Sequence, residues 1–298
     1  MTPTIERPAG WVLEECDGME REPSESRGII EPGAGRAMFS LSHLDPHPDL
    51  ADHVERHWIV RWSLPEGEPF TQAILPHPCV NLSSEPGLVA VYGIPLERSL
   101  HRIEGSGLVV GTKFRPGGFS AFSSTPVSLL NDRIVPLGEA LGEPGARLQS
   151  ELEELAGEVE AHVDAVEGFL LGRLPGPDPR YELVRAVVSD MLVVPPATTV
   201  AELADRHSIS PRTLQRAFNE HVGVSPKWVL KRYRMHEAAE RIARGEGDDL
   251  AALALDLGYF DQPHFTSDFS AQIGRSPAEY ARACALAAGR PEPALAGG

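Results

Sequence analysis

Apolar residues in the last third of the chain recur with the period of an α-helix. Leu214 and Phe218 are four residues apart, so they lie on one face of a helix, and the residues between them are mostly polar. Ser210 and Pro211 precede this stripe, and a serine followed by a proline is typical of a helix start. A shorter set of apolar residues, Ala201, Leu203 and Ala204, precedes Ser210 and marks the apolar face of another short helix. We therefore predict two helices joined by a tight turn over residues 199–222.

The same pattern returns about fifty residues later. An offset of 51 residues carries Leu214 and Phe218 to Phe265 and Phe269, and it also matches the motif Gly-Val-Ser-Pro to Gly-Arg-Ser-Pro. Upstream of the turn the offset is 50, so the second copy has one extra turn residue. The repeat predicts a second helix-turn-helix unit over residues 249–273.

A long amphipathic helix is predicted between the two copies, over residues 226–244. About 19 residues at 1.5 Å per residue span ~28 Å. Such a connector can hold two recognition helices roughly one turn of DNA (~34 Å) apart, on the same face of a duplex.

The front part of the chain has a different pattern, with short apolar runs at intervals of about ten residues. Pro, Gly or charged residues separate them, which is typical of an all-β barrel or sandwich. Residues 48–58 precede the second run and predict a short helix. The expected strands cover residues 38–44, 57–64, 70–75, 79–84, 88–94, 99–103 and 107–114.

Residues 139–173 carry an apolar stripe at helical spacing, which suits either packing on the barrel or a dimer seam. The Pro/Gly-rich linker 174–180 follows, and helix 181–194 opens the last domain. The expected fold class is α+β with two domains. The domain boundaries that we predict are a disordered tail at 1–30, a β-rich sensor at 31–138, a helical segment with linker at 139–179, a helical domain at 180–288 and a disordered tail at 289–298.

Charge is unevenly distributed along this acidic chain. The net charge is −16 overall, −15 over residues 1–179 and −1 over residues 180–298. Residues 206–234 contain seven basic residues and one acidic residue, which gives this segment a net charge of +6. This segment could meet phosphates, with a solvated helix face as the alternative. Lys227, Lys231, Arg232 and Arg234 are the expected phosphate contacts.

The chain's other bulk properties indicate a cytoplasmic location. No apolar run reaches the ~18 residues that a membrane helix needs, and the first thirty residues show no secretion signal. Cys16, Cys79 and Cys284 are too few and too scattered for a disulfide framework or a four-ligand zinc site. We expect no cofactor, no metal and no membrane partner.

The polar face of the first copy carries side chains that suit base recognition. Arg212, Gln215 and Arg216 point away from Leu214 and Phe218, and Arg and Gln can make paired hydrogen bonds to guanine and adenine in the major groove. A helix that presents them after a short turn is the helix-turn-helix arrangement.

The motifs "SPRTLQRAF", "GVSP" and "GYFDQPHFTSDFSAQIGRSPAEY" resemble those of the AraC/XylS family of bacterial transcription regulators, over about residues 180–285. The resemblance implies base contacts by Arg212, Gln215 and Arg216 in the first copy. In the second copy it implies contacts by Gln262, Pro263, His264 and Ser267.

One residue of the second copy departs from the family pattern. Family members usually carry a basic residue where Ser267 stands, and residues 247–298 have a net charge of −4. We therefore expect the first copy to carry most of the specificity.

The resemblance also implies that the N-terminal domain is a cupin-like barrel that senses a small molecule. The runs "LPHPCVNL", "VGTKFRPGGF" and "PVSLLNDRIVPL" resemble a less-studied N-terminal domain of such regulators, for which no ligand is assigned. Aromatic and polar residues inside a barrel suit a small organic effector. The candidates are Trp58, Trp62, His77, Asn81, Lys113 and Arg115.

Two of these candidates and a histidine pair have alternative interpretations. Lys113 and Arg115 suit an anion or are solvated charges at strand ends. His53 and His57, four residues apart on the expected helix, suggest a metal, although a satisfied or solvated pair is favoured.

The function that these features predict is a sequence-specific DNA-binding transcription regulator and not an enzyme. Double-stranded DNA, a small-molecule effector and RNA polymerase are its expected partners, and a homodimer is an open alternative. A barrel-type enzyme fused to a DNA-binding domain is the rival, but the sequence shows no compact metal triad and no nucleophile with a local base. A barrel that only supports dimerisation is the second rival.

Overall fold

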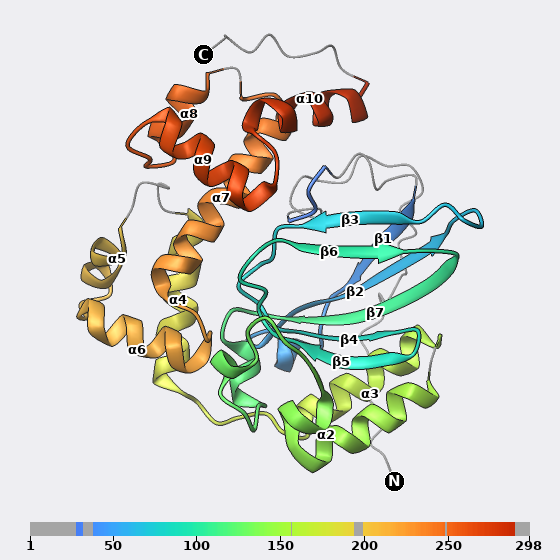
Figure 1. Cartoon of the computed structure of the whole chain (residues 1–298). Helices are drawn as coiled ribbons and strands as arrows, with labels where there is room; N and C mark the ends of the chain where they lie inside the picture. The colour runs from blue at the N-terminus through green and yellow to red at the C-terminus, as the bar shows by residue number, and fades with distance from the viewer. Residues whose placement is uncertain (1–27, 32–37, 156, 194–198, 248, 290–298) are drawn as a thin grey trace.

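The computed structural model describes residues 28–31, 38–155, 157–193, 199–247 and 249–289. Figure 1 shows a sheet-rich N-terminal part beside an all-helical C-terminal part, which confirms the predicted fold class. Most of the two predicted disordered tails lies outside the described residues. Residues 28–30 are described, and Ile30 is buried, so the packed part of the chain begins earlier than predicted.

Eight strands form the N-terminal part, as far as the structure describes it. Six of them make an antiparallel sheet in the order β1-β2-β7-β4-β5-β8, and β3 and β6 pair separately. All seven strands that the sequence predicts are present, and the short β8 was missed. Within the described residues the large sheet does not close into a barrel. The strands are β1 (Phe39–Leu44), β2 (Val54–Ser63), β3 (Phe70–Ile74), β4 (Asn81–Glu85), β5 (Leu88–Tyr92), β6 (Ser99–Ile103), β7 (Ser106–Phe114) and β8 (Ile134–Pro136).

The predicted helix over residues 48–58 is wrong. Only the single turn η1 (Pro48–Leu50) forms there, and Val54 already begins β2. In β2 the side chains of His57 and Ile59, two residues apart, are both buried in the core, as the alternation of a strand requires. The spacing of a strand and not that of a helix therefore holds over these residues. The idea of a metal pair at His53 and His57 on one helix therefore does not apply.

Two helices, α2 (Leu137–Glu154) and α3 (Val159–Leu171), cover one face of the large sheet (Figure 1). The apolar stripe predicted over residues 139–173 belongs to these helices. Val159 and Val163 pack on Ile59 of the sheet, and Leu148, Leu152, Val166 and Leu170 join the main core. Because the chain's own sheet covers the stripe, these side chains are not available as a dimer seam.

The described residues of the C-terminal part contain seven helices whose ends match the sequence signals. The connector α7 has the predicted bounds, and the two helix-turn-helix units form as α5–α6 and α8–α9. No helix of the described chain is long and apolar enough to cross a membrane. The helices are α4 (Pro179–Val193), α5 (Val200–Arg206), α6 (Pro211–His221), α7 (Pro226–Arg244), α8 (Leu250–Asp256), α9 (Gln262–Ile273) and α10 (Pro277–Ala287).

The hydrophobic cores cross the boundary between the two parts. One cluster runs from the sheet and α2 through α4 to Leu214 and Phe218 of α6. A second cluster joins Ile30 and Leu75 of the N-terminal part to Phe265 of α9. Each helix-turn-helix unit thus shares a buried core with the N-terminal part.

A buried polar group ties α3 to the sheet. The His57 Nε2 atom lies 3.2 Å from Glu167 Oε1, and His57 Nδ1 lies 2.9 Å from Thr112 Oγ1. His162 is also buried, and its Nε2 atom has no hydrogen-bond partner among the described residues. Burial, together with the charge of the nearby His57, lowers the pKa of His162 from 6.5 to about 4.

The depressed pKa of His162 predicts a loss of stability in mild acid. The folded state favours the neutral ring, so this stabilisation is present above about pH 6.5 and is lost as the pH falls through about 4. The variant His162→Leu replaces the titratable ring with an apolar side chain of similar size that cannot be protonated. We expect the wild type to lose about 3 kcal/mol more free energy of unfolding than the variant over this range. Urea unfolding at pH 7, 5.5 and 4.5 measures the difference, and parallel losses in both proteins would contradict the assignment.

Candidate nucleic-acid interface

The first recognition helix, α6, has one buried face and one exposed polar face. Ser210 caps it, since its side chain accepts a hydrogen bond from the Thr213 amide at 3.1 Å. Leu214 is fully buried, whereas Arg212 and Arg216 are exposed. Within the described chain neither guanidinium is in an ion pair, so both remain available to an external partner.

Gln215 is half-buried and bonds within the helix. Its Nε2 atom donates to Asn219 Oδ1 at 2.8 Å, which fixes the amide on the same face as Arg212 and Arg216. The three residues predicted to contact bases in the first unit therefore share one surface.

The second recognition helix, α9, has the same architecture with less charge. The side chain of Asp261 caps it by accepting a hydrogen bond from the His264 amide at 2.8 Å. His264 and Ser267 are exposed and Gln262 is half-buried. No Lys or Arg occurs in α9, so this surface has hydrogen-bonding groups but no fixed positive charge.

The four predicted phosphate contacts occupy different environments along α7. Lys227 is exposed at the start of the helix, and Lys231 is exposed but forms an ion pair with Asp268 at 2.6 Å. Arg234 is half-buried. Arg232 is buried at 3% exposure, so its guanidinium cannot reach a phosphate in this conformation, and the prediction for this residue needs correction.

Arg232 instead joins α7 to the N-terminal domain. Its Nη2 atom donates to the backbone oxygen of Leu96 at 2.7 Å, and its guanidinium lies 4.6 Å from the Trp228 ring centre. Burial lowers the pKa of Arg232 to about 10, which still leaves it charged at neutral pH. One turn further along α7, the His236 ring stacks on the His77 ring with 4.2 Å between ring centres. The His236 Nε2 atom lies 3.2 Å from the backbone oxygen of Pro76.

The N-terminal domain also holds the C-terminal end of each recognition helix. Asn131 Nδ2 donates to the Gly223 oxygen just after α6 at 2.9 Å. Arg98 Nη1 donates to the Ile273 oxygen at the end of α9 at 3.2 Å. Both helices therefore end on the N-terminal domain, and both keep their N-terminal turns exposed.

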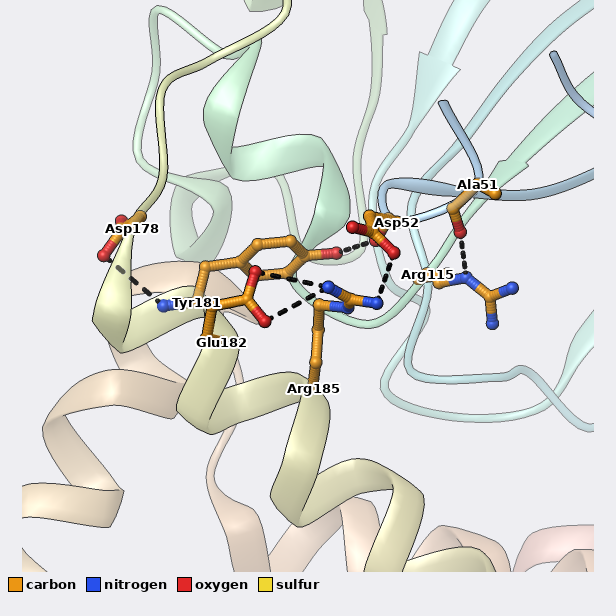
Figure 2. A network of polar contacts seen from close by, with 7 residues as sticks. All are labelled: Ala51, Asp52, Arg115, Asp178, Tyr181, Glu182 and Arg185. Carbon is orange, nitrogen blue, oxygen red and sulfur yellow. Dashed lines mark hydrogen bonds and ion pairs between the residues drawn. The ribbon is translucent and has the colours of Figure 1, made fainter. Parts of the chain in front are cut away.

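A third group of contacts surrounds the first turn of α4, as Figure 2 shows. The Tyr181 hydroxyl donates to the Asp52 backbone oxygen at 2.5 Å, and Arg185 pairs with the Asp52 carboxylate. The Tyr181 ring stacks on His53 with 4.9 Å between ring centres, and burial lowers the pKa of His53. Sequence reasoning missed this network, because Asp52 and Tyr181 are 129 residues apart and neither belongs to a motif.

The six predicted effector residues fall into two groups. Trp58, Trp62, Asn81 and Lys113 lie on the face of the large sheet opposite α2 and α3, since their strand partners share one side of the ladder. The Trp58 Nε1 atom donates to Asn81 Oδ1 at 3.2 Å. His77 and Arg115 lie elsewhere, at the boundary with the helical domain, where Arg115 donates to the Ala51 oxygen at 2.6 Å (Figure 2).

The charge of Lys113 is already partnered. Its Nζ atom lies 3.0 Å from Glu55 Oε1, and Glu55 also pairs with Arg56 at 2.6 Å. Burial alone would raise the pKa of the Glu55 carboxyl, but these two cations hold it below its usual value. Among the described residues no three His, Cys, Asp or Glu side chains are grouped to hold a metal ion.

Known proteins resemble the C-terminal domain. A family model described as a helix-turn-helix domain matches residues 203–283, which include both recognition helices. The HTH-type transcriptional activator RhaS of Escherichia fergusonii is 35% identical over 77 residues, which are 26% of this chain and 27% of RhaS. A putative AraC-like transcription regulator of Streptomyces antibioticus is 34% identical over 124 residues, which are 41% of this chain and 38% of that protein.

The C-terminal domain of the chain therefore resembles that of AraC-like transcription regulators. The match spans about a quarter of the length of RhaS. Residues 42–136 match a family described as a domain of unknown function (DUF6597). A crystal structure of ToxT from Vibrio cholerae aligns over 82% of this chain and 97% of that chain, with 12% identity and a TM-score of 0.34.

Two equivalent glycines give a test of the contact at the helix ends. Gly223 and Gly274 have nearly equal positive φ angles, 85° and 86°, so alanine strains both backbones equally. An added Cβ at Gly223 would lie 2.8 Å from the Ser128 backbone nitrogen, while at Gly274 it would meet the flexible Arg98 guanidinium. We expect Gly223→Ala to cost about 1–3 kcal/mol more than Gly274→Ala. Urea unfolding of the full chain compares them, and equal costs would show that the contact at α6 is loose.

Proposed function

We propose that this chain is a cytoplasmic transcription regulator that binds double-stranded DNA through two helix-turn-helix units. In each unit the recognition helix enters a major groove with its exposed N-terminal turns. Arg212, Gln215 and Arg216 read bases in the first groove, and Gln262, His264 and Ser267 contact the second. Lys227 contributes a phosphate contact.

The observation that carries this proposal is the exposed polar face of α6. A buried stripe at Leu214 and Phe218 fixes the helix in the core, and the opposite face presents two guanidinium groups that form no ion pair with the described residues. Clustered arginines of this kind, on a helix that follows a tight turn, suit the edges of bases in the major groove. The two recognition helices lie near opposite ends of α7 (Figure 1). The helix spans ~28 Å at 1.5 Å per residue, close to one turn of DNA.

The N-terminal domain would set the spacing of the two units. Its contacts at Asn131, Arg98 and Leu96 hold both recognition helices and the connector between them. A small molecule bound to the sheet-rich domain, on the face with Trp58 and Asn81, would act by shifting these contacts. Control by such an effector is the finer part of the proposal, and ligand screening by thermal shift tests it.

The base-reading role of Arg216 predicts a loss that depends on DNA sequence. On DNA selected by the full chain, Arg216→Ala should weaken binding by about 1–3 kcal/mol and relax the preference at one base pair. On random DNA the loss should be smaller. Arg147→Ala, which removes an equally charged, exposed residue of α2, is the matched control and should change neither affinity. Equal losses of Arg216→Ala on both DNAs would refute base reading.

Phosphate contacts predict a steep dependence on salt. Each contact releases counterions, so log Kd should rise linearly with log salt concentration, by about 0.9 per phosphate. Lys227→Ala should weaken binding to all sequences and lower this slope by about one. Fluorescence anisotropy from 50 to 200 mM salt measures the slope. An unchanged slope in Lys227→Ala would remove Lys227 from the interface.

A further inference from the structure

The two helix-turn-helix units differ by one residue, and their backbone hydrogen bonds locate it. In the first unit the amide of Ile209 donates to the Ala204 oxygen at 3.0 Å. In the second unit the amide of Tyr259 donates to the Ala254 oxygen at 2.9 Å. Ile209 and Tyr259 both pack on the core, so they are equivalent positions with an offset of 50.

The N-cap residues have an offset of 51. Ser210 follows Ile209 directly and caps α6, whereas one residue separates Tyr259 from the cap of α9 at Asp261. The extra turn residue of the second unit is therefore Phe260.

Phe260 is 89% exposed, although the other aromatic residues of this unit are buried. Tyr259 is 9% exposed and Phe265 is fully buried, so the turn places two aromatic rings in the core and one in solvent. Phe260 also directly precedes α9, whose N-terminal turns carry the exposed His264. An exposed aromatic side chain directly before a recognition helix can contact the same DNA groove as that helix.

The turn that carries Phe260 has a half-buried cation beside it, Arg234 of α7, which interacts electrostatically with Tyr259. α9 has no Lys or Arg, and the nearby Lys231 is neutralised by Asp268, which also accepts a hydrogen bond from the Tyr259 hydroxyl at 2.7 Å. The recognition helix itself therefore supplies no fixed positive charge with which to attract phosphates or to bind guanine. Apolar contact with the methyl group of thymine is the form of major-groove recognition that a phenyl ring supplies.

We propose that Phe260 is a specificity-determining residue that contacts the 5-methyl group of a thymine in the second major groove. This inference rests on the proposed function, because it requires that α9 lies in DNA. It assigns to the second unit a readout by shape and apolar contact, beside the readout by arginines in the first unit.

The test removes the 5-methyl group of thymine without changing base pairing. DNA is first selected by the full chain, and each thymine on the side of the second unit is then replaced in turn by deoxyuridine. Wild-type affinity should fall about four-fold at one position, since that contact buries roughly one methyl group. Phe260→Ala should bind thymine DNA more weakly and show no further loss on deoxyuridine. Leu286→Ala, which deletes an apolar side chain that is 83% exposed on α10, should behave as wild type.

The outcomes separate this inference from the proposed function. Selection of no sequence by the wild type would refute both. Selection of a sequence with equal deoxyuridine effects in wild type and Phe260→Ala would overturn only the thymine contact. Wild-type DNA affinity in Phe260→Ala, combined with lost transcriptional output, would also overturn it and place Phe260 against a protein.

Discussion

The structure depends on how the N-terminal domain holds the C-terminal ends of the two recognition helices. The last carbonyl groups of a helix have no partner within it and need donors from elsewhere. Here Asn131 supplies one donor just after α6 and Arg98 supplies one at the end of α9. Because these contacts occupy the C-terminal ends, the N-terminal turns of both helices remain exposed, and these are the turns that enter a major groove in helix-turn-helix proteins.

The same interface explains the unusual position of Arg232. A buried guanidinium loses its hydration, and the bond to the Leu96 oxygen and the contact with Trp228 offset only part of that cost. Its Nε and Nη1 atoms have no hydrogen-bond partner among the described residues. An arginine in this position is thus more costly to bury than an apolar residue, but it connects the middle of α7 to the N-terminal domain. The basic residues of α7 are therefore divided between two surfaces. Arg232 contacts the N-terminal domain, and Lys227 is exposed to solvent.

Local features of the fold could be predicted from the sequence, because they depend on neighbouring residues. Serine or aspartate caps at Ser210, Asp261 and Ser225 fixed the helix starts, and the bounds of α7 followed from its apolar stripe. The start of β2 could not be predicted, since the polar residues after Val54 suit a helix, and only their pairing with β7 makes them a strand. Contacts between segments that are far apart in the sequence could not be predicted either. His236 and Pro76 are 160 residues apart, and nothing local marks His77 as a stacking partner and not an effector ligand.

The most direct test of the central claim is a hydroxyl-radical footprint of the full chain on DNA that it selects. Two recognition helices held on one connector should protect two patches about 10.5 base pairs apart, on the same face of the duplex. A single protected patch, or two patches on opposite faces, would contradict the simultaneous binding of both units.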